Sequence, residues 1–69
     1  MVKKSRIQYI TSIQNGFVVN NQELSFEVLK QFINDKGITH IKCAMSDIKN
    51  WQLIRNYCNT YKINFTNIK

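Results

Sequence analysis

The sequence predicts one small α+β domain whose elements follow the order β-β-α-β-α-β. Three observations indicate this fold. An Asn-Gly pair separates two apolar runs near the N-terminus, two amphipathic segments with helix start and stop signals follow, and a β-like run comes after each of these segments. A chain of 69 residues has room for one domain with one small core, so residues 1–69 are treated as a single unit.

A β-hairpin is expected first. Side chains at residues 7–13 alternate in character, and a second apolar run at 17–20 follows Asn15-Gly16. An Asn-Gly pair favours a type I′ turn, because both central residues of that turn need positive φ. A two-residue turn at this pair places Ile13 opposite Val18.

The first helix is predicted over residues 25–36. Asn20-Asn21 before it is a second turn candidate, which either ends the strand or folds it back onto residues 22–24. Ser25 is a suitable N-cap and Gly37 stands where a helix-ending glycine belongs. The apolar arc of this helix consists of Phe26, Val28, Leu29, Phe32 and Ile33.

A strand is expected over residues 39–45 and a second helix over about 47–61, with Ser46 or Asp47 as the N-cap. A last β-like run covers residues 63–68. Apolar side chains recur on one face of the second helix at three- and four-residue steps, namely Ile48, Trp51, Ile54, Cys58 and Tyr61.

The simplest architecture for this order is a four-stranded mixed sheet with two helices packed on one face. Residues 38–68 form a strand-helix-strand unit, which normally closes right-handed with parallel strands. Both helices must cover an apolar sheet face, so the other face is left open to solvent or to a partner. Tyr9 and Phe17 lie on the hairpin, one face of which can be exposed. Exposed strand aromatics beside lysines can stack on unpaired bases, but more often they pack against a neighbouring strand.

The charge distribution points to a polyanionic partner. Ten Lys and Arg residues stand against four Asp and Glu residues, a formal net charge of +6 at pH 7. Such an excess favours nucleic acid, although a solvated basic surface is an equally common explanation. Residues 1–6 are expected to form a flexible basic arm. The candidate nucleic-acid contacts are Lys3, Lys4, Arg6, Lys42, Lys49, Arg55 and Lys62.

Motifs for catalysis, metals and cofactors are missing from the sequence. One His and two Cys residues far apart do not form a metal pattern, two isolated glycines do not build a phosphate loop, and the four carboxylates all have structural explanations at helix ends or on solvated helix faces. We therefore expect no enzyme activity, no cofactor and no metal. Cys43 and Cys58 replace apolar residues, which is typical of reduced, buried thiols in a cytoplasmic protein. The sequence has no run of about 20 apolar residues, which is the length that a membrane span needs.

These observations leave two hypotheses for function. The first is a small non-enzymatic nucleic-acid-binding accessory or regulatory protein, acting on DNA or RNA. A composition rich in Ile, Asn and Lys suggests an AT-rich genome, such as that of a phage or plasmid. The second is a protein-protein interaction module, either a small inhibitor or adaptor of a larger protein or a homodimer. It would use an exposed sheet face or an edge strand, with residues 63–68 as the best edge candidate.

Overall fold

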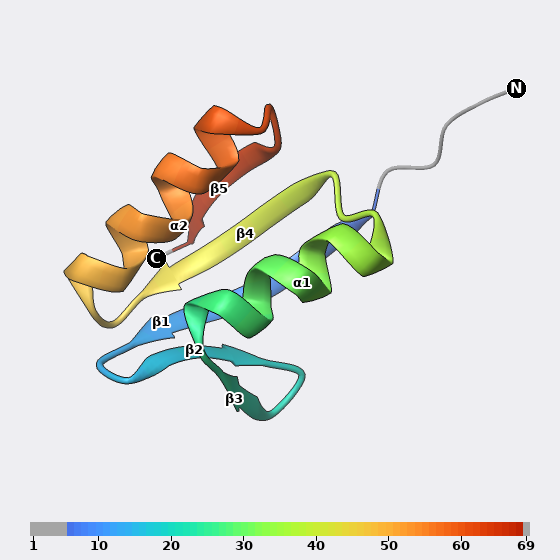
Figure 1. Cartoon of the computed structure of the whole chain (residues 1–69). Helices are drawn as coiled ribbons and strands as arrows, with labels where there is room; N and C mark the ends of the chain where they lie inside the picture. Colours follow the sequence, from blue (N-terminus) through green and yellow to red (C-terminus); the bar gives the residue numbers. More distant parts are fainter. Residues whose placement is uncertain (1–5, 69) are drawn as a thin grey trace, which may run out of the picture.

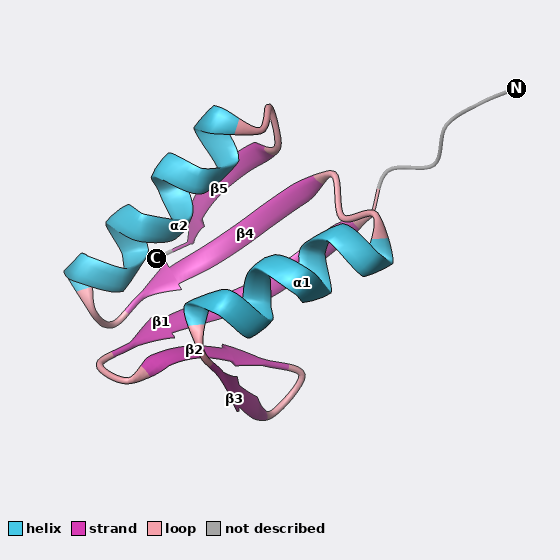
Figure 2. Ribbon diagram, viewed as in Figure 1, coloured by secondary structure: helices cyan, strands magenta, loops and turns pink. Residues whose placement is uncertain are grey.

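The structure is a computed structural model that describes residues 6–68 (Figures 1 and 2). Within these residues it contains two helices and one five-stranded sheet. The elements are β1 (Ile7–Ile13), β2 (Gly16–Val19), β3 (Gln22–Leu24), α1 (Phe26–Lys36), β4 (His40–Met45), α2 (Ile48–Thr60) and β5 (Asn64–Ile68). The α+β class is confirmed. The predicted four-stranded sheet and the order β-β-α-β-α-β each lack one strand. Residues 22–24 pair with β2 as a short fifth strand.

The sheet is mixed, with the strand order β3-β2-β1-β4-β5. β1, β4 and β5 are parallel, and β2 runs antiparallel to both of its neighbours. The chain crosses the sheet in the same direction from β3 to β4 and from β4 to β5, so right-handed crossovers bring both helices to one face. Figure 1 shows both helices on the same side of the sheet. We call this side the covered face, and the opposite side, which no element within residues 6–68 covers, the open face.

The first hairpin turn lies one residue earlier than the sequence pattern predicted. Ile13 pairs with Gly16 instead of Val18, so the turn consists of residues 14 and 15. Gly16 is thereby the first residue of β2, with φ at +148°. A Cβ atom at this position would collide with the carbonyl oxygen of Leu24 in β3. The close approach of β3 therefore requires the glycine within the strand, and the turn forms without it.

The second turn candidate folds the chain back onto β2. Asn20 and Asn21 have φ values of 52° and 68°, the left-handed conformation that a type I′ turn needs at both central residues. Asparagine tolerates this conformation better than most residues. The side-chain amide of Gln8 donates a hydrogen bond to Asn20 Oδ1 at 3.3 Å. Of the two outcomes that the sequence left open at this turn, the structure takes the return into a short strand.

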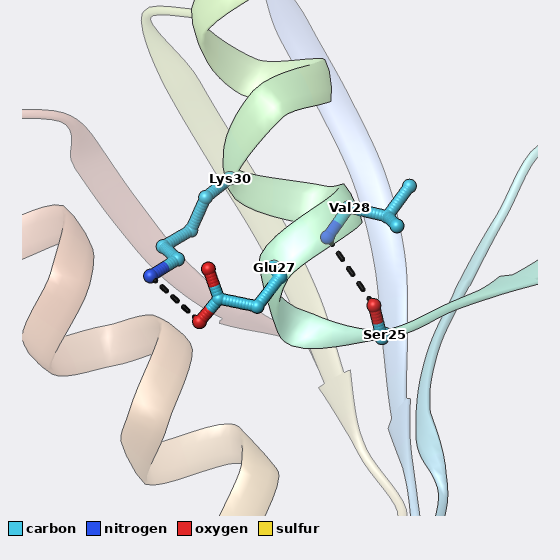
Figure 3. A network of polar contacts seen from close by, with 4 residues as sticks. All are labelled: Ser25, Glu27, Val28 and Lys30. Atoms are coloured by element: carbon cyan, nitrogen blue, oxygen red, sulfur yellow. Dashed lines mark hydrogen bonds and ion pairs between the residues drawn. The ribbon is translucent and has the colours of Figure 1, made fainter.

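Helix α1 begins and ends where its caps predicted. Ser25 Oγ accepts a hydrogen bond from the Val28 N–H at 3.3 Å (Figure 3). Gly37 ends the helix in the left-handed conformation, with φ at +62°. Figure 3 also shows the ion pair between Glu27 Oε2 and Lys30 Nζ, which are 3.0 Å apart and one helical turn from each other. The predicted range of residues 25–36 is confirmed.

Helix α2 is joined at its first turn to the end of β1. Asp47 caps the helix by accepting the Asn50 N–H at 3.0 Å. The fully buried Ser12 hydroxyl donates to the Asp47 carbonyl oxygen at 2.8 Å, and the Asn50 side-chain amide donates to the Ile13 carbonyl oxygen at 2.6 Å. These bonds satisfy buried polar groups and fix the helix start relative to the sheet.

The core lies between the covered face and the two helices. Its buried apolar residues are Ile10, Phe17, Val19, Leu29, Ile33, Ile41, Cys43, Ile54 and Cys58. Most residues of the predicted helix faces are buried or packed against the core. Val28, Ile48 and Tyr61 are exceptions and are exposed.

Candidate nucleic-acid interface

The open face carries an uninterrupted set of side chains from all five strands. Side chains alternate between the faces of a strand, and the buried residues Ile10, Phe17 and Ile41 mark the covered face. The opposite alternation assigns to the open face Ile7, Tyr9, Thr11 and Ile13 of β1, Val18 of β2, Glu23 of β3, His40, Lys42 and Ala44 of β4, and Asn64, Thr66 and Ile68 of β5.

Carboxylates are kept away from the centre of this face. Glu27 and Asp35 lie in α1, and Asp47 caps α2, so these three acidic residues belong to the helix layer. Glu23 alone of the four carboxylates shares the open face, and it sits on the edge strand β3. Lys42 lies on β4, one of the inner strands. The centre of the open face therefore carries one cation, Lys42, and no carboxylate, which favours contact with an anion.

Tyr9 and Lys42 form a pair at that centre. They are directly opposite each other on the parallel strands β1 and β4. Tyr9 is 59% exposed, and the Lys42 ammonium lies 5.4 Å from the centroid of its ring. A cation at this distance is attracted by the ring face. An accessible aromatic ring and a positive charge are thus held side by side on a rigid sheet.

A shallow hollow of about 320 Å³ lies beside Tyr9. Four lining residues form one row across the sheet, because Val18 pairs with Thr11, Thr11 with Ala44, and Ala44 with Ile68. Ala44 has the smallest side chain of the row, and Thr11 and Ile68 flank it. The short side chain of Ala44 therefore contributes to the hollow.

The rim of the hollow includes two carboxamide residues. Asn20 and Asn21, from the β2–β3 turn, line it together with the strand residues. Both are exposed. Carboxamides offer donors and acceptors, so a ligand in the hollow would meet an aromatic ring on one side and hydrogen-bonding groups on another.

A hydrogen bond crosses the open face next to Tyr9 and Lys42. His40 Nε2 lies 2.7 Å from Thr66 Oγ1, and it joins β4 to the edge strand β5. His40 is half-buried on β4.

The structure separates the basic residues that the sequence grouped together. Lys42 lies on the open face, whereas Lys49 and Arg55 are exposed on α2, on the other side of the sheet. Lys62 follows the end of α2 with φ at +59°, so it does not continue the helix edge that Arg55 occupies. Arg6 precedes β1 and borders a groove of about 480 Å³ with Lys36. Lys3 and Lys4, which carry most of the predicted arm, lie outside the described residues.

On α2, Arg55 belongs to a different environment. Its guanidinium carbon is 5.8 Å from the Trp51 ring centroid, and with Asn56 and Asn59 it lines a groove of about 350 Å³ beside β5. Trp51 itself is half-buried and donates its indole N–H to Asn67 Oδ1 at 3.0 Å. Trp51 therefore ties α2 to the edge strand, which makes it a structural residue in this fold.

The two cysteines are free thiols in the core. Burial raises the pKa of Cys43 from 9.0 to about 11 and that of Cys58 from 9.0 to about 12. Desolvation is the main cause in both, because it disfavours the charged thiolate. A thiol with a raised pKa is a poor nucleophile at neutral pH, so both residues act as small core side chains.

These thiols predict a loss of stability at alkaline pH. Because the folded-state pKa values lie above the unfolded value of 9.0, the unfolded chain loses its thiol protons first. The free energy of unfolding should be unaffected by the thiols below pH 9 and fall above it, by roughly 1 kcal/mol per pH unit for each thiol. Urea titrations between pH 8 and the folded pKa of Cys43, about 11, measure this. A Cys43→Ala variant should show a shallower fall, and an equally steep one would contradict the prediction.

Among residues 6–68, no three His, Cys, Asp or Glu side chains come together as a metal site. Neither helix of the described chain has the length and apolar character that crossing a membrane requires. Comparison of the chain with protein-family models, curated proteins and solved structures returned no match. The geometry of the open face is therefore the basis for assigning a function.

Sequence reasoning identified some parts of this interface and missed others. Lys42 was among the candidate contacts, and Tyr9 was one of two hairpin aromatics expected on an exposed face. The other, Phe17, is fully buried. The hollow was missed, because Thr11 and Ala44 become neighbours only through the pairing of β1 with β4. The signal that was available is the small side chain of Ala44 at an open-face position of its strand.

Proposed function

We propose that the protein is a small non-enzymatic nucleic-acid-binding protein whose binding surface is the open face of the sheet. The observation that carries this proposal is the Tyr9 and Lys42 pair at the centre of a face without central carboxylates. Aromatic rings beside lysines on sheets bind bases and phosphates at the same time. The basic residues that precede β1 in the sequence, Lys3, Lys4 and Arg6, add positive charge for phosphate contacts.

Salt dependence tests this proposal. With phosphate contacts from Lys42 and the three N-terminal cations, the logarithm of the binding constant should fall against the logarithm of salt concentration with a slope of about −3. Fluorescence anisotropy with labelled DNA and RNA oligonucleotides at several ionic strengths gives this slope. Absence of binding to either nucleic acid at low salt would remove the proposal.

The variants Lys42→Ala and Lys49→Ala locate the surface. Each removes one positive charge, but Lys42 lies on the open face and Lys49 on α2. Lys42→Ala should weaken binding and reduce the salt slope by about 0.7 to 0.9, as expected for one lost phosphate contact. Lys49→Ala should leave both quantities near those of the parent protein. Equal effects of the two substitutions would show that binding depends on net charge and not on the open face.

A second candidate function is protein-protein interaction. Ile7 is 46% exposed on the open face, and Ile13, Val18, Ala44 and Ile68 on the same face are partly exposed. β5 is an edge strand, as expected for residues 63–68, and its outer edge has no partner within the described chain. Such features suit a homodimer or a larger protein partner. Light scattering on the purified protein tests the homodimer, and a monomer at all concentrations would argue against it.

A further inference from the structure

We propose that the hollow beside Tyr9 receives an unpaired nucleobase, so that the ligand is single-stranded nucleic acid and not a duplex. This assignment rests on the function proposed above and specifies its ligand class. It follows from three features of the open face: an accessible ring at the edge of a hollow, the small side chain of Ala44 within it, and a cation next to the ring.

A base in the hollow would stack on the ring of Tyr9. A base is a flat aromatic group, and bases of single strands stack on exposed Tyr, Phe or Trp rings without dependence on sequence. Tyr9 borders the hollow, and Ala44 leaves room within it that a larger side chain would fill. A base in the hollow would also cover the apolar surfaces of Val18 and Ile68. The hollow therefore matches a planar, mostly apolar group with polar edges.

Polar side chains around the hollow match the edges of a base and its phosphate. The edges of a base carry donors and acceptors, and the exposed carboxamides of Asn20 and Asn21 line the hollow. Asn20 Oδ1 already accepts a hydrogen bond from Gln8, so Asn20 offers its Nδ2 donor to a base. Carboxamides pair with base edges in many protein complexes with nucleic acids. Lys42, 5.4 Å from the Tyr9 ring centroid, is placed to contact a phosphate next to a stacked base. Base, edge and phosphate would thus each meet a matching group within one small area.

The position of Tyr9 excludes a base of a duplex from the same site. The major groove of duplex DNA admits a helix or a two-stranded ribbon, whereas Tyr9 lies on β1, the middle strand of five. Bases inside a duplex are paired and stacked on each other, so they expose only their edges in the grooves. A base can reach the ring of Tyr9 only when it is unpaired and turned outward.

The experiment compares three labelled probes of equal length at low salt. These are a single-stranded oligonucleotide, the corresponding duplex, and an abasic oligonucleotide that keeps the phosphate backbone without bases. The parent protein should bind the single strand at least about fivefold more tightly than the abasic probe, since one stacked base contributes about 1–3 kcal/mol. The duplex should bind more weakly than the single strand.

Four variants test the hollow itself. Tyr9→Ala removes the ring and Ala44→Leu fills the hollow, and each should lower affinity for the single strand about tenfold while binding to the abasic probe stays unchanged. Tyr9→Phe keeps the ring and Ala44→Ser keeps the hollow, so both should bind like the parent protein. Circular dichroism and thermal unfolding confirm that each variant is folded. In the parent protein, the methyl NMR signals of Thr11 and Ala44 should shift when the single strand is added.

The outcomes separate this proposal from the function on which it rests. Equal binding of single strand, duplex and abasic probe, with no effect of Tyr9→Ala or Ala44→Leu, would overturn base insertion and leave nucleic-acid binding in place. Absence of binding to all three probes would overturn the proposed function, and base insertion with it. A dimer that Tyr9→Ala dissociates would assign the open face to a second copy of the chain and overturn both.

Discussion

Substitution of Gly16 by alanine is expected to remove a large part of the protein's stability. Gly16 has φ at +148°, where a side chain costs about 1–3 kcal/mol of backbone strain. Its new methyl group would also collide with the Leu24 carbonyl oxygen, and only a shift of the β3 backbone could relieve this contact. We expect a total loss of about 3 kcal/mol or more. A domain of 69 residues has roughly 3–10 kcal/mol of stability, so this loss is a large part of it.

Gly37→Ala is the matched control. Gly37 also has positive φ, at +62°, but no atom lies within 4 Å of the position that its Cβ would occupy. It should cost only the left-handed penalty of about 1 kcal/mol. Urea unfolding followed by circular dichroism compares the two variants. Similar losses would show that the approach of β3 to Gly16 contributes little, and would weaken our explanation of the hairpin register.

The second large effect is expected for Phe17→Ala. Phe17 is fully buried on the covered face, with its ring centroid 6.0 Å from that of Phe26 in α1. Truncation of a buried phenylalanine costs about 3–5 kcal/mol, because apolar contacts are lost and a cavity remains. Circular dichroism and urea titration should show a chain that is unfolded or close to its unfolding midpoint without denaturant.

Tyr9→Ala serves as the control for this substitution. Tyr9 is an aromatic residue of the same hairpin, but it lies on the open face and is mainly exposed. Its truncation should cost less than about 1 kcal/mol, since surface substitutions rarely have larger effects. The order of the two losses tests the assignment of faces directly. A Tyr9 variant as unstable as the Phe17 variant would contradict it, and would also remove Tyr9 as a probe of binding.

Features with short-range causes could be predicted from the sequence. Ser25 and Gly37 bound α1, and Asp47 starts α2, because each forms its cap with residues a few positions away in the chain. Short-range patterns in the sequence likewise predicted both helices, their buried central turns and the strands β1, β2, β4 and β5. The right-handed crossover rule then predicted a sheet with one covered face.

The short strand β3 and the hairpin register depend on contacts that local patterns do not contain. Residues 22–24 are two polar residues and one leucine, which is too little alternation to indicate a strand. They pair because the two asparagines before them adopt the left-handed turn. With β3 on β2, the backbone at Leu24 lies so close to Gly16 that only glycine fits there, and the first turn consists of residues 14 and 15.

The sequence by itself determined the net charge, the helix bounds and the absence of catalytic motifs. Tertiary structure alone decided which residues share a surface. The sheet places Lys42 on one side and Lys49 and Arg55 on the other, although all three had been grouped by charge. It also turns Phe17 into the core and Tyr9 outward, and joins Thr11 to Ala44 across 33 positions of sequence. The physical reason is that a sheet face collects alternate residues from distant strands, so its composition is fixed by pairing and register and not by neighbours in the chain.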